Sequence, residues 1–188
     1  MDRAGLFRRF LHCLMAFAPA YYLLPVDLPF MGLERWVLLI GFIFAVSLVE
    51  SVRLLMGWTF FGLRPHERNQ IASFVWAAAG VTVALWFFRE DVATAAIIGW
   101  ALVDPLAGVL RRRSRRLAVS VAVPVAVYLA LAVPSLYLWG MLSVPSVALV
   151  SVAGAATAVF VERQKVRYID DDFLMIVLPC LVMELLSF

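Results

Sequence analysis

Hydrophobic residues occur in long runs along the whole chain, and short polar stretches separate the runs. Several runs approach the ~20 residues that a helix needs to cross the hydrocarbon core of a bilayer. Pro145, which suits the first turn of a helix, marks a break between the fifth and sixth runs at Ser143. The pattern predicts one all-α domain, residues 1–188, with seven membrane-spanning helices. The predicted spans are residues 10–26, 36–56, 71–88, 92–110, 117–142, 144–161 and 173–188.

The composition changes this picture little. Of the 188 residues, 64% are hydrophobic and 15% are charged, and the mean hydropathy is +0.95. Soluble domains are about half apolar and a quarter charged, so the composition excludes an ordinary soluble domain. The net charge of +3 does not indicate a nucleic-acid partner, because the basic residues lie in short loops between apolar runs.

Small residues spaced by four, Ser151 with Ala155 and Gly154 with Ala158, predict close packing of the sixth span. A dimer interface is the alternative, so oligomerisation stays open.

The distribution of positive charge predicts the orientation in the membrane. With seven spans, every one of the 16 lysines and arginines except Arg35 and Arg89 falls on the side that holds the N-terminus. Loops rich in Lys and Arg stay in the cytoplasm. The sequence therefore predicts a cytoplasmic N-terminus and a C-terminus outside.

Acidic residues from four regions gather on the same predicted side: Glu50, Glu67, Asp104, Glu162, Asp170, Asp171 and Asp172. Asp104 lies in the apolar part of "GWALVDPLAGVLRRRSRR" (residues 99–116), about two helical turns before the first of five arginines. A lone carboxylate in lipid is costly, so Asp104 is expected to face the bundle and to have a partner. Arg53, Arg111 and a bound metal are the candidates, and a salt bridge that only fixes helix packing is the alternative.

Carboxylates beside cations at one membrane face suit phosphate chemistry. Mg²⁺ needs one or two carboxylates plus phosphate oxygens, and Arg donates two hydrogen bonds to a phosphoryl group. His12 and His66 are weak signals, because a lone His near the lipid headgroups is more often an interfacial side chain than a base. The aromatic segment at residues 56–64 is a candidate entry for a lipid tail, and a helix end with a surface loop is the alternative.

The order of these motifs resembles a known family. Glu50-x-x-Arg53, Arg64-x-x-Glu67 and Asp104-x-x-Ala107 are followed by Glu162 at the end of a late span and by the triplet at residues 170–172. This series, over residues 45–188, is similar to the integral-membrane CTP-dependent lipid-alcohol kinases, which include dolichol kinase, phytol kinase and the CTP-dependent diacylglycerol kinase.

The resemblance implies phosphoryl transfer from CTP, or from ATP, to the hydroxyl of a polyprenol, a phytol-like alcohol or a diacylglycerol. It implies Mg²⁺ as a cofactor and an active site that faces the cytoplasm. The residues expected to be catalytic are Asp104, Glu67 and Asp171. Those expected to bind nucleotide phosphates are Arg53, Arg64, Arg111, Arg112 and Lys165. The expected metal ligands are Asp104, Asp171, Asp172 and Glu162.

Two departures from the family pattern keep other functions open. Where the family has a glycine-rich loop, this chain has "GVLRRRSRRLAV", and the acidic triplet ends in Asp172 instead of Asn. The alternative is therefore a non-catalytic relative that binds or transports lipid. A small-ion or solute transporter, based on Asp104 and Glu184 as intramembrane carboxylates, is a third hypothesis.

Overall fold

The computed structural model describes residues 3–28, 32–113, 116–140, 142–164 and 169–187. The prediction of an all-α fold is confirmed. Seven α-helices make up most of the described chain: α1 (Arg3–Leu14), α2 (Trp36–Met56), α3 (Ser73–Phe87), α4 (Glu90–Arg113), α5 (Leu117–Trp139), α6 (Val144–Arg163) and α7 (Asp171–Leu185). They are joined by two 3-10 helices, η1 (Met15–Leu23) and η2 (Pro65–Asn69), and by an antiparallel hairpin of β1 (Asp27–Leu28) and β2 (Leu33–Glu34).

Four of the helices, α2, α4, α5 and α6, are long and apolar enough to cross a membrane. The other three predicted spans are shorter as α-helices, with 12 residues in α1, 15 in α3 and 15 in α7. The first predicted span is not one continuous α-helix, because the chain changes to a 3-10 helix at Met15 and that helix contains Pro19. Proline has no backbone N–H, so Pro19 cannot donate the α-helical hydrogen bond to the carbonyl of Met15.

Local sequence explains where several helices begin and end. Gly57 closes α2 in the left-handed conformation, with φ of 66°, which glycine adopts without a steric penalty. α6 begins at Val144 with Pro145 in its first turn, so the predicted break at Ser143 is confirmed. Asp170 caps α7 by accepting a hydrogen bond from the backbone N–H of Asp172.

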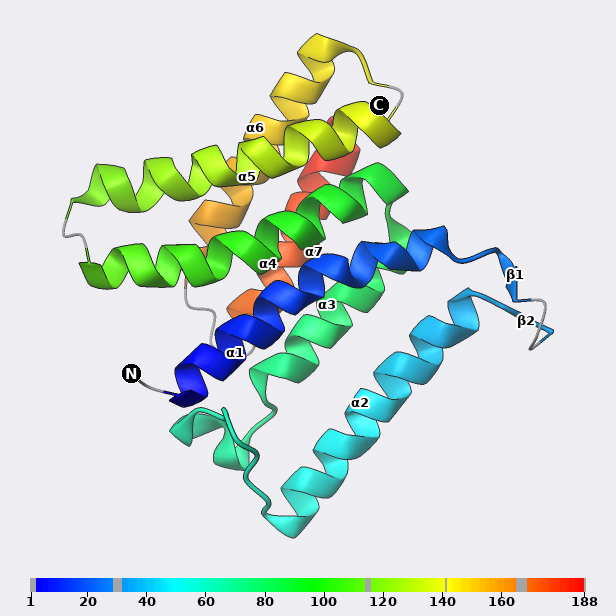
Figure 1. Cartoon of the computed structure of the whole chain (residues 1–188), viewed down its shortest axis with the longest axis vertical. Helices are drawn as coiled ribbons and strands as arrows, with labels where there is room; N and C mark the ends of the chain where they lie inside the picture. The colour runs from blue at the N-terminus through cyan, green and yellow to red at the C-terminus, as the bar shows by residue number, and fades with distance from the viewer. Residues whose placement is uncertain (1–2, 29–31, 114–115, 141, 165–168, 188) are drawn as a thin grey trace.

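α4 runs through the middle of the bundle, in contact with α1, η1, α5 and α7 (Figure 1). Its side chain Trp100 and Tyr128 of α5 are fully buried. Gly99 lets the Tyr128 ring lie directly against α4, since a Cβ at that position would overlap the ring. The N-terminal ends of α1, α3 and α7 lie toward the same side of the bundle as the C-terminal end of α4, whereas the C-terminal end of α7 lies on the opposite side (Figure 1).

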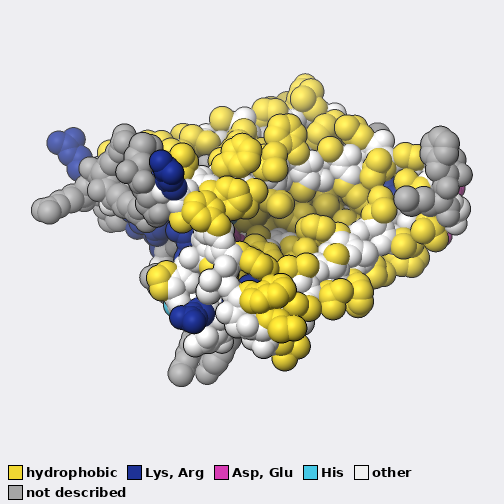
Figure 2. Space-filling view, turned by 60° about the horizontal axis from the view of Figure 1, so that its bottom comes forward, with side chains coloured by type: hydrophobic (Ala, Val, Ile, Leu, Met, Phe, Trp, Pro, Cys, Tyr) yellow, Lys and Arg dark blue, Asp and Glu magenta, His cyan; other side chains and the backbone are white. Residues whose placement is uncertain are grey.

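α2 stands apart from the other helices and packs mainly against α3 (Figure 1). Its side chains Phe44, Leu48 and Leu55 are exposed. Hydrophobic side chains cover most of the surface seen in Figure 2, and Lys and Arg gather toward one side of that view. An apolar outer surface of this kind suits a helix bundle that is surrounded by lipid instead of water.

Candidate functional site

Three side chains with metal-binding atoms meet where α1, α4 and α7 come together. Nε2 of His12 lies 3.7 Å from Oδ2 of Asp104, and Nδ1 of His12 lies 3.9 Å from Oδ1 of Asp172. One candidate ligand atom of each residue lies within 4.8 Å of those of the other two. The two N···O distances are longer than hydrogen bonds, which measure about 2.7–3.2 Å. The three side chains therefore gather at one place in the bundle, and neither nitrogen of His12 is within hydrogen-bond distance of the carboxylate that it faces.

Trp100 orients two members of this group. Its Nε1 donates a hydrogen bond of 3.1 Å to Oδ1 of Asp172, and the centroid of its ring system lies 4.1 Å from that of His12. Trp100 precedes Asp104 by four residues, so both lie on the same face of α4. Trp100 was not among the residues predicted from the sequence, although its spacing of four from Asp104 on one helix was a signal that could have identified it.

Several predicted site residues surround the group. Asp104 interacts electrostatically with Asp171, Arg64 and Arg111 as well as with His12. Nη2 of Arg111 lies 2.6 Å from Oε1 of the buried Glu162. The structure therefore brings together, from five separate segments, His12, Arg64, Asp104, Arg111, Glu162, Asp171 and Asp172.

The Asp170 carboxyl lies at the edge of this group, just before α7. Burial raises the pKa of Asp170 to about 6, although the hydrogen bond from the Asp172 backbone N–H acts in the opposite direction. The nearby carboxylate of Asp171 also favours the protonated form of Asp170. Burial, more than the neighbouring carboxylates, therefore favours the protonated form of Asp170 at the start of α7.

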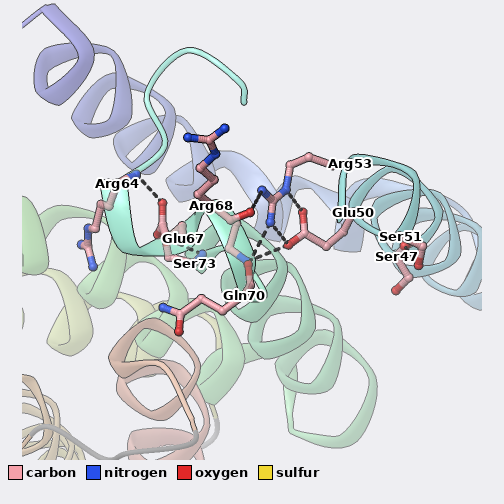
Figure 3. Close-up of polar contacts among 10 residues, drawn as sticks. Ser47, Glu50, Ser51, Arg53, Arg64, Glu67, Arg68, Gln70 and Ser73 are labelled. Atoms are coloured by element: carbon pink, nitrogen blue, oxygen red, sulfur yellow. Dashed lines mark hydrogen bonds and ion pairs between the residues drawn. The ribbon is translucent and has the colours of Figure 1, made fainter. Parts of the chain in front are cut away.

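The motif Glu50-x-x-Arg53 lies near the C-terminal end of α2, beside the connection between η2 and α3 (Figure 3). Arg53 donates two hydrogen bonds to the Glu50 carboxylate, of 2.7 and 2.8 Å, and both side chains are buried. Arg53 also donates to the backbone oxygens of Arg68 and Gln70, and Glu50 accepts from the Ala72 N–H. The pair therefore holds the connection between η2 and α3 against the end of α2.

Glu67, in η2, also stabilises the connection between η2 and α3 (Figure 3). One carboxylate oxygen accepts from the Arg64 N–H at 2.6 Å, and the other accepts from the Ser73 N–H at 3.2 Å. Burial by itself raises the pKa of Glu67, but these hydrogen bonds outweigh it, so the pKa lies below its ordinary value. In this geometry the carboxylate satisfies backbone donors at the starts of η2 and α3.

The predicted partners of Asp104 can now be compared with the structure. Arg53 is engaged with Glu50, and Arg111 lies against Glu162, while Asp104 faces His12. The side chain of Arg112 and the whole of Lys165, both expected to bind phosphates, lie outside the described residues.

An apolar cavity of about 360 Å³ opens beside the His12–Asp104–Asp172 group. Its walls come from α1, α2, α3 and α4, and His12 and Asp172 are part of its lining, together with Arg8 and Arg9. The apolar lining residues are Leu11, Met15, Phe42, Val46, Phe74, Ala77, Ala78, Trp100 and Pro105.

A second cavity, also of about 360 Å³, adjoins the first and shares Arg8, Leu11, Ser73 and Phe74 with it. Residues 60–63, from the aromatic segment proposed as a lipid entry, line this second cavity. The two cavities thus lie on either side of shared wall residues, one beside the aromatic segment and the other beside the polar group.

The donor set suits a divalent cation, because two carboxylates and an imidazole are common ligands of such ions. Arg64 and Arg111, near Asp104, are the side chains suited to phosphate oxygens. Comparison of the chain with models of protein families, with curated proteins and with solved structures finds no match. The geometry of the site and the order of the sequence motifs therefore carry the functional proposal.

Proposed function

We propose that this protein is a membrane lipid kinase that transfers a phosphoryl group from a nucleoside triphosphate to the hydroxyl of a lipid alcohol at the cytoplasmic side. The observation that carries the proposal is the apolar cavity whose lining includes His12 and Asp172, beside Asp104. An apolar space suits the tail of a lipid, and the polar end suits a hydroxyl that must meet a phosphate. CTP as the donor follows from the resemblance to the lipid-alcohol kinases.

The proposal includes seven membrane crossings with the N-terminus in the cytoplasm. The start of α1 and the end of α7 lie at opposite ends of the bundle, which supports an odd number of crossings (Figure 1). All lysines and arginines except Arg35 and Arg89 then lie on the cytoplasmic side, in agreement with the usual charge bias. The polar group falls on this side, where nucleotides are present.

The side chains supply the parts that phosphoryl transfer needs, mainly positioning and neutralisation of charge. Asp104 and Asp172 would hold a divalent cation such as Mg²⁺, which when bound neutralises negative charge on the phosphates. Arg64 and Arg111 would bind phosphate oxygens. The lipid hydroxyl, entering through the cavity, attacks the terminal phosphorus and passes its proton to a carboxylate of the group as the nucleoside diphosphate leaves.

One observation favours a second candidate, a non-catalytic protein that binds or transports lipid. α4 continues as a helix through residues 108–113, where the related kinases have a glycine-rich loop. A continuous helix offers few free backbone N–H groups to phosphates. The arginines at its end would have to replace them.

The deciding experiment incubates the purified protein with Mg²⁺, labelled CTP or ATP, and a panel of polyprenol, phytol and diacylglycerol. The expected result is a labelled lipid phosphate from at least one alcohol, and its loss in Asp104→Asn. Saturable lipid binding without any phosphorylated product would favour the second candidate and contradict the kinase.

A further inference from the structure

His12 has a buried nitrogen that the fold leaves unsatisfied. Its Nε2 is inaccessible to solvent and has no hydrogen-bond partner within the described part of the chain. A buried polar atom without a partner costs about 1–3 kcal/mol, so native proteins contain few of them. This nitrogen faces Oδ2 of Asp104 at 3.7 Å, which is too far for a hydrogen bond. A ligand between the two atoms would remove the cost.

The spacing of the group fits a metal ion. Bonds from a divalent cation to nitrogen or oxygen measure about 2.0–2.2 Å, so two donors on one ion can lie up to about 4.2 Å apart. Nε2 of His12 lies 3.7 Å from Oδ2 of Asp104, between hydrogen-bond length and this limit, and one ligand atom each of His12, Asp104 and Asp172 lies within 4.8 Å of the other two. Two carboxylates that face one point also repel each other, and a cation at that point reverses the repulsion.

Trp100 has the position of a residue that orients ligands. Its indole N–H donates to Oδ1 of Asp172, and its ring packs beside the His12 imidazole. Metal-ligating side chains are commonly held in this way by a neighbouring donor or packed side chain. The ligand geometry is thus largely formed before any ion binds.

The nitrogen donor decides which ion the group prefers. Carboxylate oxygens alone suit Mg²⁺, whereas an imidazole suits transition-metal ions, which bind nitrogen more strongly. We propose that His12, Asp104 and Asp172 form a binding site for a divalent transition-metal cation, in which His12 is a direct ligand and gives Mn²⁺ an advantage over Mg²⁺. The role of that cation in phosphoryl transfer rests on the proposed function, but the site itself does not.

The first test is spectroscopic and needs no variant. The metal-stripped protein in detergent is titrated with Mn²⁺, and electron paramagnetic resonance counts the bound ions. We expect one tightly bound Mn²⁺ per chain, with electron spin-echo modulation from a directly coordinated ¹⁴N nucleus. Absence of tight binding, or bound Mn²⁺ without a ¹⁴N signal, would overturn the proposal.

The second test compares the two histidines of the chain. His12→Ala should lose the ¹⁴N signal and weaken Mn²⁺ binding by at least about 10–100-fold, the loss that follows from removing even an outer partner of a ligand. His66→Ala is the matched control, because His66 is exposed on η2 and should leave both readings unchanged. Equal Mn²⁺ affinity of the His12→Ala protein and the parent would contradict the site.

The binding measurement separates this inference from the proposed function. Mn²⁺ binding through His12 without any lipid phosphate as product would retain the site and reject the kinase. Mg²⁺-dependent lipid phosphorylation with no effect of His12→Ala on Mn²⁺ binding would support the kinase and reject the proposed metal site.

Discussion

The indole N–H of Trp100 donates a hydrogen bond to Oδ1 of Asp172, which joins the middle of α4 to the first turn of α7. The two residues are 72 positions apart in the chain. Trp100 is fully buried and also packs against His12 of α1, so one side chain connects the three helices that carry the candidate metal ligands.

Trp100→Phe keeps an aromatic ring but removes this donor. We expect Mn²⁺ binding to weaken by about 10–100-fold, because Asp172 loses the bond that orients it. The thermal midpoint should also fall, by an amount equivalent to about 1–3 kcal/mol for the lost hydrogen bond. Trp86→Phe, at an exposed position on α3, is the control and should change neither quantity. Unchanged binding in Trp100→Phe would show that Asp172 needs no orienting donor.

Asp104→Asn removes a charge but keeps the shape of the side chain. We expect lipid phosphorylation to fall by orders of magnitude, because stabilisation of the transferring charge is the main catalytic contribution. Asp91→Asn is the matched control on the same helix, since Asp91 is buried and paired with Arg89 far from the group. Asp91→Asn should lower the melting temperature without lowering turnover per folded molecule. The reverse pattern, a stability loss in Asp104→Asn with full activity, would assign Asp104 to packing alone.

Arg53→Met tests the buried Glu50–Arg53 pair that holds α2 against the η2–α3 connection. The substitution leaves the Glu50 carboxylate buried without its partner, which costs about 3–5 kcal/mol of stability. Arg68→Ala is the control, because the side chain of Arg68 is exposed and only its backbone oxygen receives the Arg53 bond. Chemical or thermal unfolding in detergent measures both. A cost below about 1 kcal/mol for Arg53→Met would mean that the connection is held by other contacts.

Glu67 predicts a dependence of stability on pH. Its folded pKa lies below the ordinary value of 4.5 because backbone N–H groups of Arg64 and Ser73 bond to the ionised form. Ionised Glu67 therefore contributes stability above about pH 4.5, and this contribution disappears as pH falls through the lowered pKa. The difference in melting temperature between the parent and Glu67→Gln should be largest near pH 7 and should shrink below pH 4.5. A difference that stays constant down to pH 3 would contradict this assignment.

Val46→Trp tests the lipid cavity. Val46 lines the apolar space on α2, so the larger ring fills volume that a lipid tail would occupy. An overpacking cost of about 1–3 kcal/mol corresponds to a rise of about 5–150-fold in KM for the lipid, while KM for the nucleotide stays constant. Val152→Trp, at an exposed position on α6, is the control. If both variants keep the lipid KM of the parent, the lipid binds elsewhere.

Much of the fold could be predicted because hydropathy and capping act locally. The apolar runs predicted the long helices α2, α4, α5 and α6, and Pro145 marked the start of α6. The first run was less informative. Hydropathy does not report the change from α1 to η1 at Met15, and the presence of a proline does not predict it either, because Pro105, Pro124, Pro134 and Pro179 lie inside α-helices.

The candidate site, like the fold, could be predicted only in part from the sequence. Because a carboxylate inside an apolar run is costly, the sequence by itself determined that Asp104 needs a partner from within the bundle. Only the tertiary structure decided which partner it has. Helix packing places His12, 92 positions earlier in the chain, opposite Asp104, and commits Arg53 and Glu67 to the η2–α3 connection. These contacts depend on helix crossing and rotation, which are set by side-chain packing across the whole bundle and not by any local pattern.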